Sequence, residues 1–176
     1  MEREMDLRGK EAASLSSLVK QEYQIPDSYY FGEVKRGLRN SDGTGVLIGV
    51  TKVGSVQGYL IEDGRRIPVP GKLYYRGIDL NEIVEAHRKS GTFGYEEVAY
   101  LLLMGHLPTK SELSYFNDIM CKARKLPEGF TEGMIMRHPS RDIMNNLARS
   151  VLLLYSYDEN PDDTSVENLL TQSIQL

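Results

Sequence analysis

Stretches of helical periodicity flank a glycine-rich region in this chain. In residues 7–22, Leu and Val recur at loosely helical spacing among charged residues, and Pro26 follows them, which predicts a first helix. Between residues 37 and 77 the periodicity disappears, because nine of the sixteen glycines fall there together with Pro68 and Pro70. Glycine and proline disfavour helix interiors, so this region is predicted to be non-helical.

Short β-strands are predicted inside the glycine-rich region. Residues 46–53 and 59–61 favour β structure, and Gly54 and Gly58 are expected to break the strands. The Asp-Gly pair at residues 63–64 lies between two such runs and indicates a tight hairpin turn. We therefore expect two or three short strands here.

From residue 78 onward the pattern changes to a helical period of about 3.6 residues. Asp79 followed by Glu82 resembles a capping box, and Gly91 is expected to end this helix. Its predicted apolar face consists of Leu80, Ile83, Val84 and His87. Residues 95–104 are apolar nearly all round and are followed by Gly105, which predicts a buried helix at the centre of the local core.

Two further helices are predicted between residues 109 and 157. Thr109 and Glu112 repeat the capping box, and Pro127 ends the first of these helices. Its expected inward stripe consists of Leu113, Phe116, Met120 and Ala123. The His-Pro-Ser sequence at residues 138–140 is expected to open the second helix, with Pro139 near its first position. Its wide apolar face comprises Ile143, Met144, Leu147, Val151 and Leu154.

The run at residues 151–154 is apolar on every side, so other helices of this chain or another subunit must cover it. A last helix is predicted to begin at Thr164 with Glu167 as its capping partner. Its expected apolar face consists of Val166, Leu169, Leu170 and Ile174. This pattern is still running at Leu176, so we expect the helix to be cut there rather than completed.

Composition restricts the class of protein. Of the 176 residues, 40% are hydrophobic and 26% are charged, which is typical of a folded globular protein. The formal net charge is −4 and the charges are mixed along the chain, which argues against nucleic acid or an anionic membrane as the main partner. Residues 1–20 have no apolar core of the length expected of a signal peptide, and no apolar run approaches the roughly 20 residues that a membrane span needs. With Cys121 as its single cysteine, a cytoplasmic location is expected.

The three histidines do not form a recognisable site in the sequence. His87, His106 and His138 are separated by 19 and 32 residues, and neither an HExxH nor a CxxC motif accompanies them. We expect His87 to be a core or partly exposed residue of a helix face and His106 to belong to a turn. For His138, a structural or helix-capping role is favoured.

Other candidate residues also favour structural readings. Glu96 and Glu97 are adjacent, so on a helix they point about 100° apart and complement the helix dipole rather than acting as an acid–base pair. The glycines at residues 43–49 lack the spacing and the Lys-Ser/Thr of a phosphate loop, which favours strand and turn geometry. Cys121, beside Met120 on a helix, is expected to be an inert, semi-buried thiol.

Several segments together resemble the citrate synthase family. Residues 36–54 and 67–80 look like the family's N-terminal strands and their run into the first helix of its large domain, and the Tyr-Arg-Gly-Ile-Asp sequence at 75–79 is the most telling part. Residues 95–109 and the His-Pro pair at 138–139 match later helices in the same order. The family usually has Met at the position of Ser140. The resemblance runs from about residue 34 to the end, roughly the first two fifths of a family chain.

The resemblance implies a mainly α fold, namely the leading part of a citrate synthase large domain with a small glycine-rich β element. It divides the chain into an N-terminal helical segment (1–33), a β-hairpin region (34–77) and the helical part of the large domain (78–176). The implied reaction condenses acetyl-CoA with oxaloacetate to give citrate and CoA. The family's two histidines, aspartate and substrate-binding arginines lie beyond the position that matches Leu176. No catalytic, substrate-binding, metal or cofactor residue is therefore assigned here.

Family members are dimers joined by antiparallel helices, which implies a homodimer contact through apolar helices such as residues 140–157. We predict that Leu153→Asp or Leu154→Asp would disrupt association of the full-length protein. Two alternatives stay open: a 2-methylcitrate synthase that uses propionyl-CoA, and a non-catalytic helical interaction module. The chain alone is expected to be inactive.

Overall fold

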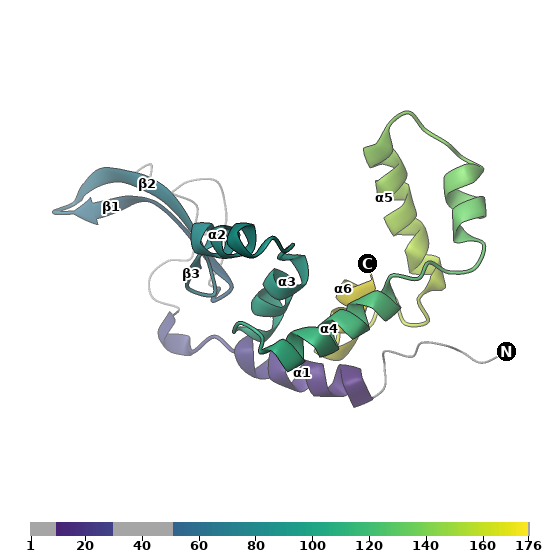
Figure 1. Cartoon of the computed structure of the whole chain (residues 1–176), viewed down its shortest axis with the longest axis horizontal. Coiled ribbons are helices and arrows are strands. Elements are labelled where there is room, and N and C mark those ends of the chain that lie inside the picture. Colours follow the sequence, from purple (N-terminus) through teal and green to yellow (C-terminus); the bar gives the residue numbers. More distant parts are fainter. Residues whose placement is uncertain (1–9, 30–50, 176) are drawn as a thin grey trace. The chain divides into compact units, whose positions relative to one another are not determined.

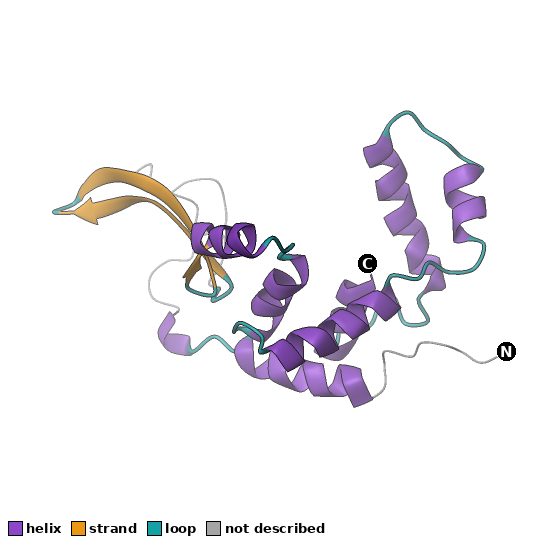
Figure 2. Ribbon diagram, in the orientation of Figure 1, coloured by secondary structure: helices purple, strands orange, loops and turns teal. Residues whose placement is uncertain are grey.

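The computed structural model describes residues 10–29 and 51–175, which form helices, connecting turns and one small antiparallel sheet (Figure 1; Figure 2). The α-helices are α1 (Lys10–Glu22), α2 (Leu80–Ser90), α3 (Tyr95–Met104), α4 (Lys110–Ala123), α5 (Ile143–Leu154) and α6 (Val166–Gln175). The strands are β1 (Gly54–Glu62), β2 (Arg65–Tyr75) and β3 (Ile78–Asp79). Short helical turns η1 (Asp27–Tyr29) and η3 (Tyr155–Tyr157) and a π-helical segment η2 (Thr131–Met136) complete the described structure. The predicted mainly α fold with a small β element is confirmed.

These elements belong to two compact units. One unit lies within residues 18–113 and holds the sheet, α2 and α3. The other combines residues up to 17 with residues 114–176 and holds η2, α5 and α6. The three-part division at residues 33 and 77 stays a prediction.

The β1–β2 hairpin has the predicted turn but longer strands than predicted. Asp63 and Gly64 have φ values of 49° and 71°, so both central residues are left-handed, as the tight two-residue hairpin turn requires. The predicted strand at residues 46–53 is wrong where it can be compared, since residues 51–53 are not strand, and residues 46–50 lie outside the described part. Gly54 and Gly58 do not break β1, which runs through both.

The continuity of β1 has a physical reason. The register shifts between Gln57, which pairs with Lys72, and Tyr59, which pairs with Pro68. Gly58 therefore lies opposite the extra residues of β2 in an irregularity of the β-bulge kind, and β1 continues through it. Pro68 pairs with Tyr59 in a stretch of β2 where β1 is its only partner among the described strands. A proline there can point the side without an N–H away from the ladder, so β2 tolerates it.

The caps of α2 and α3 follow the prediction. Asp79 is the N-cap of α2 and accepts a hydrogen bond of 2.9 Å from the backbone N–H of Asn81. Gly91 ends α2 and Gly105 ends α3, both in left-handed conformations that glycine adopts without steric cost. The buried side chains of α3 are Tyr100, Leu101 and Met104, whereas Tyr95 is 66% exposed. The prediction of a buried helix is therefore correct for one side of α3 only.

The predicted apolar face of α2 is only partly correct. Ile83 is buried, but Val84 is exposed, although the helical spacing put both on one face. Helical spacing shows which residues share a face of α2, but it does not show which part of that face a neighbouring element covers.

Helix α4 begins with a complete capping box. The backbone N–H of Thr109 donates to Glu112 Oε2 at 2.7 Å, and the N–H of Glu112 donates to Thr109 Oγ1 at 3.3 Å. The buried residues of α4 are Phe116, Ile119 and Ala123. The predicted inward stripe did not include Ile119.

Two predicted helix starts are wrong by one to three residues. Helix α5 begins at Ile143, and its N-cap is Asp142, which accepts from the N–H of Asn145 at 3.0 Å. Pro139 was predicted near the first helical position, but it precedes α5 and lies outside the helix. Helix α6 is capped by Ser165, not Thr164, since Ser165 Oγ accepts from the N–H of Asn168. In both cases a second polar residue close by competed for the cap, and sequence spacing did not distinguish the two.

The buried face of α6 also differs from the prediction. Leu170 is buried together with the polar side chains of Asn168 and Thr171, whereas Val166 and Leu169 are exposed. Asn168 can be buried because its side-chain amide donates to the carbonyls of Asn160 and Asp163, at 3.0 and 2.8 Å. The loop before α6 thus selects which face turns inward.

Candidate functional site

The three histidines occupy separate environments. His87 is in the last turn of α2 with a side chain that is 16% exposed, His106 follows α3 in the turn before α4, and His138 is exposed ahead of α5. Among the described residues, no group of three or more His, Cys, Asp or Glu side chains is arranged to hold a metal ion. The structural readings of His87 and His106 fit these positions.

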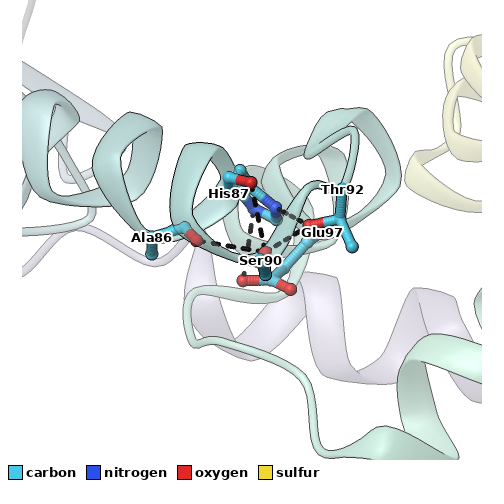
Figure 3. Close-up of polar contacts among 5 residues, drawn as sticks. All are labelled: Ala86, His87, Ser90, Thr92 and Glu97. Carbon is cyan, nitrogen blue, oxygen red and sulfur yellow. Dashed lines mark hydrogen bonds and ion pairs between the residues drawn. The ribbon is translucent and has the colours of Figure 1, made fainter.

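His87 is the centre of a polar network between α2 and α3 (Figure 3). Its Nδ1 lies 2.8 Å from Thr92 Oγ1, and Thr92 Oγ1 lies 2.7 Å from Ser90 Oγ. Ser90 also donates to the backbone carbonyl of Ala86 at 3.0 Å. On the other side of the ring, His87 Nε2 lies 3.7 Å from Glu97 Oε1, is buried, and makes no hydrogen bond. The hydrogen bonds of this network lie within the last turn of α2 and the residue pair that follows it, and the approach of His87 Nε2 to Glu97 reaches the first turn of α3.

Gly94 makes room for this histidine. A Cβ atom at Gly94 would lie 2.5 Å from His87 Cδ2, far inside van der Waals contact. The residue that precedes α3 must therefore be glycine for the imidazole to keep its place. Ser90, Thr92 and Gly94 were not predicted as neighbours of His87. Ser90 is the last residue of α2, and Thr92 and Gly94 lie in the short connection to α3.

A second cluster joins the α3–α4 turn. The Tyr100 and His106 rings meet edge to face with centroids 5.6 Å apart, and His106 Nε2 lies 3.9 Å from Glu112 Oε1. Burial raises the pKa of Tyr100, with a further contribution from the nearby Glu112 carboxylate. The Thr109 backbone N–H, which donates to Glu112, lowers the pKa of that carboxyl group. Because Glu112 is engaged by the capping box, this cluster serves the turn and not proton transfer.

Arg76 ties three elements of its unit together. Its Nε and Nη2 both donate to the carbonyl oxygen of Leu102, at 3.3 and 2.9 Å, and its guanidinium lies over the Tyr23 ring at 5.1 Å. The Tyr23 hydroxyl donates to the same carbonyl at 3.2 Å. Leu102 is in the last turn of α3, where carbonyls lack helical partners and a cation is favoured.

This role of Arg76 was not assigned from the sequence. The residue belongs to the Tyr-Arg-Gly-Ile-Asp segment and has a φ of 49°, unusual for a side chain with a Cβ. Its backbone N–H donates to the Val53 carbonyl at 2.9 Å, which holds the chain in this conformation. The only signal in the sequence was an arginine at the junction of a strand and a helix.

The remaining candidates also lie apart. Glu97 faces His87, and Glu96 is its neighbour in the first turn of α3, so the two do not form an acid–base pair. The glycines at residues 43–49 lie outside the described residues. Cys121 is exposed, so the prediction of a semi-buried thiol is wrong. It falls between the inward positions Ile119 and Ala123 and therefore points to the opposite side of α4.

His138 does not cap α5. Its carbonyl oxygen accepts a hydrogen bond from Arg149 Nη2 at 3.2 Å, and Arg149 also contacts Asn146 one turn earlier in the helix. Asp142 fills the capping position. The contact is structural, as predicted, but it runs through the backbone of His138.

Helix α5 turns its apolar side outward. Ile143, Leu147 and Val151 recur every four residues and are 79%, 54% and 42% exposed. Its less exposed positions include the polar residues Asn146, Arg149 and Ser150. Met144 and Leu152 are also largely exposed, and α5 has no buried residue. Leu153 and Leu154 are half-buried. We call the surface of Ile143, Met144, Leu147, Val151 and Leu152 the α5 apolar face.

The contacts described above join turns, helix ends and neighbouring helices. A shallow, open depression along α2 is lined mainly by Asn81, Glu82, Glu85 and Lys89, whose flexible side chains do not enclose a ligand. None of the helices in the described ranges has the length and hydropathy to span a bilayer.

Comparison with known proteins identifies the family. The protein-family model described as "Citrate synthase, C-terminal domain" matches residues 42–175 of the chain. Two similar curated proteins are citrate synthases. The one from Haloferax volcanii is 31% identical over 132 residues, which cover 74% of this chain and 29% of that protein. The one from Corynebacterium glutamicum is 38% identical over 87 residues, covering 49% and 18% respectively. The chain therefore spans less than a third of the length of these relatives, and it belongs to the citrate synthase family.

Proposed function

We propose that this chain is part of an enzyme that condenses acetyl-CoA with oxaloacetate and releases citrate and CoA. The observation that supports this proposal is the family match over residues 42–175. Because the chain spans 29% of the Haloferax volcanii relative, the activity is proposed for a protein that contains this chain together with the rest of the family fold.

The chemistry requires a base and hydrogen-bond donors. A carboxylate removes a weakly acidic proton from the acetyl group, and donors stabilise the negative charge that develops on the thioester oxygen. The resulting enol carbon attacks the ketone of oxaloacetate, and hydrolysis of the thioester then frees CoA. In this chain, His87 and Arg76 are engaged in contacts that hold turns and helix ends. We propose that the acid–base groups come from the part of the family fold that this chain does not span.

The α5 apolar face supports a second part of the proposal, namely association with another copy of the same protein. Its side chains are exposed, while the polar residues Asn146 and Ser150 of the same helix are less so. An amphipathic helix with this orientation gains burial of its apolar side only from something outside its unit. A symmetric pair of such helices would cover both copies at once.

The test of the catalytic proposal is release of CoA thiol. The protein that contains this chain should release thiol from acetyl-CoA when oxaloacetate is added, and not when either substrate is omitted. The 176-residue chain alone should release none. Oxaloacetate-dependent release by the chain alone would contradict the placement of the acid–base groups. Absence of release by the longer protein would contradict the proposed reaction.

The same assay separates the alternatives. A preference for propionyl-CoA over acetyl-CoA would identify the 2-methylcitrate reaction. The exposed α5 apolar face favours, as a second candidate, a non-catalytic helical interaction module. A module of that kind would release no thiol with either acyl-CoA, while still associating through α5.

A further inference from the structure

We propose that the turn between α2 and α3 contains a proton-dependent link, in which protonation of His87 engages Glu97. This inference does not depend on the catalytic proposal. The link would join the last turn of α2 to the first turn of α3, because His87 and Glu97 belong to these two turns. It would tighten the connection when the imidazole ring is charged.

On the Glu97 side of the ring, a nitrogen and a carboxylate oxygen approach each other without forming a hydrogen bond. His87 Nε2 is buried and has no hydrogen-bond partner, yet Glu97 Oε1 lies 3.7 Å away (Figure 3). When Nδ1 carries the single proton of the neutral ring, the lone pair of Nε2 faces a carboxylate with no hydrogen between them. Protonation places an N–H in that gap, and a side-chain movement of a few tenths of an ångström completes a charge-assisted hydrogen bond.

The hydroxyl groups on the other side of the ring accept either protonation state. With the ring charged, Nδ1 donates to Thr92 Oγ1, Thr92 donates to Ser90 Oγ, and Ser90 donates to the Ala86 carbonyl. With the ring neutral and its single proton on Nδ1, the same three donations persist. The hydroxyl groups therefore keep their hydrogen bonds when the ring changes its charge, and Nε2 alone gains or loses an N–H.

The charges around His87 point to Glu97 as the responding group. Within the described part of the chain, the side chain of His87 interacts with Thr92 and Glu97. The neighbouring cation of α2, Arg88, pairs with Glu85 on the outer surface of that helix. The quantity that reports the link is the coupling between the two side chains.

A double-mutant cycle measures this coupling. His87→Gln, Glu97→Gln and the double variant of the full chain would be compared with the unaltered chain at about pH 5.5 and about pH 8, on either side of the ordinary titration range of histidine. The readout is the amide-exchange protection of Thr92, whose N–H donates to the His87 carbonyl, after correction for intrinsic exchange rates. We expect a coupling of about twofold to fivefold at the lower pH that disappears at the higher pH.

Glu96→Gln is the matched control, because it removes the same charge from the same helical turn at the adjacent position, about 100° around the helix from Glu97. Glu96→Gln should not change the effect of His87→Gln on the protection of Thr92 at either pH. Equal His87–Glu97 coupling at both pH values would overturn the proposal. So would an equally large effect of Glu96→Gln, which would show a general charge effect at the start of α3.

Discussion

At the scale of single residues, the polar contacts that organise this chain gather at helix ends. Arg76 donates twice to the last turn of α3, Thr109 and Glu112 exchange hydrogen bonds at the start of α4, and Asp79 caps α2. Each contact satisfies backbone groups that a helix leaves without partners. Their chemistry is therefore directional, and conservative substitutions should not be neutral.

Replacing Arg76 with Lys should destabilise the chain by about 1–2 kcal/mol, although the charge is kept. Lysine has a single nitrogen, so it cannot reproduce the two hydrogen bonds to the Leu102 carbonyl, and it stacks less well on Tyr23. Urea unfolding followed by circular dichroism measures the change. Arg88→Lys, at an exposed ion pair with Glu85, is the control and should change the free energy of unfolding little.

Glu112 should make stability depend on pH in acid. Its pKa is lowered in the folded chain, chiefly by the hydrogen bond from the Thr109 backbone N–H. Because the folded pKa is below the unfolded one, its contribution is present above the unfolded pKa of about 4.3 and is lost as the pH falls through the folded pKa. Unfolding curves between about pH 6 and about pH 3 should therefore lose more stability in the unaltered chain than in Glu112→Gln. Parallel losses would contradict this assignment.

At the scale of elements, glycine position decides the shape of the hairpin. Gly64 supplies a left-handed turn residue, and Gly58 lies where the register of β1 and β2 shifts. Gly71 lies in the same irregular stretch, on β2, but its φ is not left-handed and a Cβ there would meet nothing within 4 Å. The glycines of this hairpin are therefore expected to differ in how well they tolerate replacement by alanine.

Gly64→Ala should destabilise the hairpin by about 1–2 kcal/mol, because an L side chain strains the left-handed turn. Gly71→Ala in the neighbouring strand is the matched control, and it should be neutral or slightly stabilising. Thermal unfolding of both variants, with amide exchange of β1 and β2 as the local readout, separates the two. Equal losses would indicate that the turn is not under this constraint.

At the scale of the whole molecule, the proposed association depends on the outward orientation of α5. The apolar face of this helix is exposed, and the half-buried Leu153 and Leu154 make a weaker test of association than a fully outward residue does. Leu147 is 54% exposed in the middle of that face. A charge placed there should oppose burial while leaving the unit itself folded.

Leu147→Asp should therefore reduce self-association of the protein that contains this chain at least tenfold, as an interfacial charge without a partner is costly. Sedimentation equilibrium gives the association constant, and circular dichroism confirms folding. Asn145→Asp adds the same charge at an exposed polar position of the same helix and should have no such effect. Unchanged association of Leu147→Asp would contradict an interface at the α5 apolar face.

The sequence by itself determined the mainly α class, the hairpin turn at Asp63 and Gly64, the glycine ends of α2 and α3, and the capping box at Thr109. These features depend on residues within four positions of each other, so local spacing contains the information. Tertiary structure decided which spaced apolar residues became buried, as Val84 and Leu169 show by their exposure. It also selected the caps at Asp142 and Ser165.

The partners of His87 and Arg76 were decided in the same way. Glu97 and Leu102 belong to α3, whereas His87 lies in α2 and Arg76 in the turn between β2 and β3, and no rule of local spacing brings them together. The outward direction of the α5 apolar face likewise depends on what η2 and the rest of its unit cover. Local geometry fixes elements and their ends, whereas burial and long-range hydrogen bonds depend on how the elements pack, because packing is a property of several segments at once.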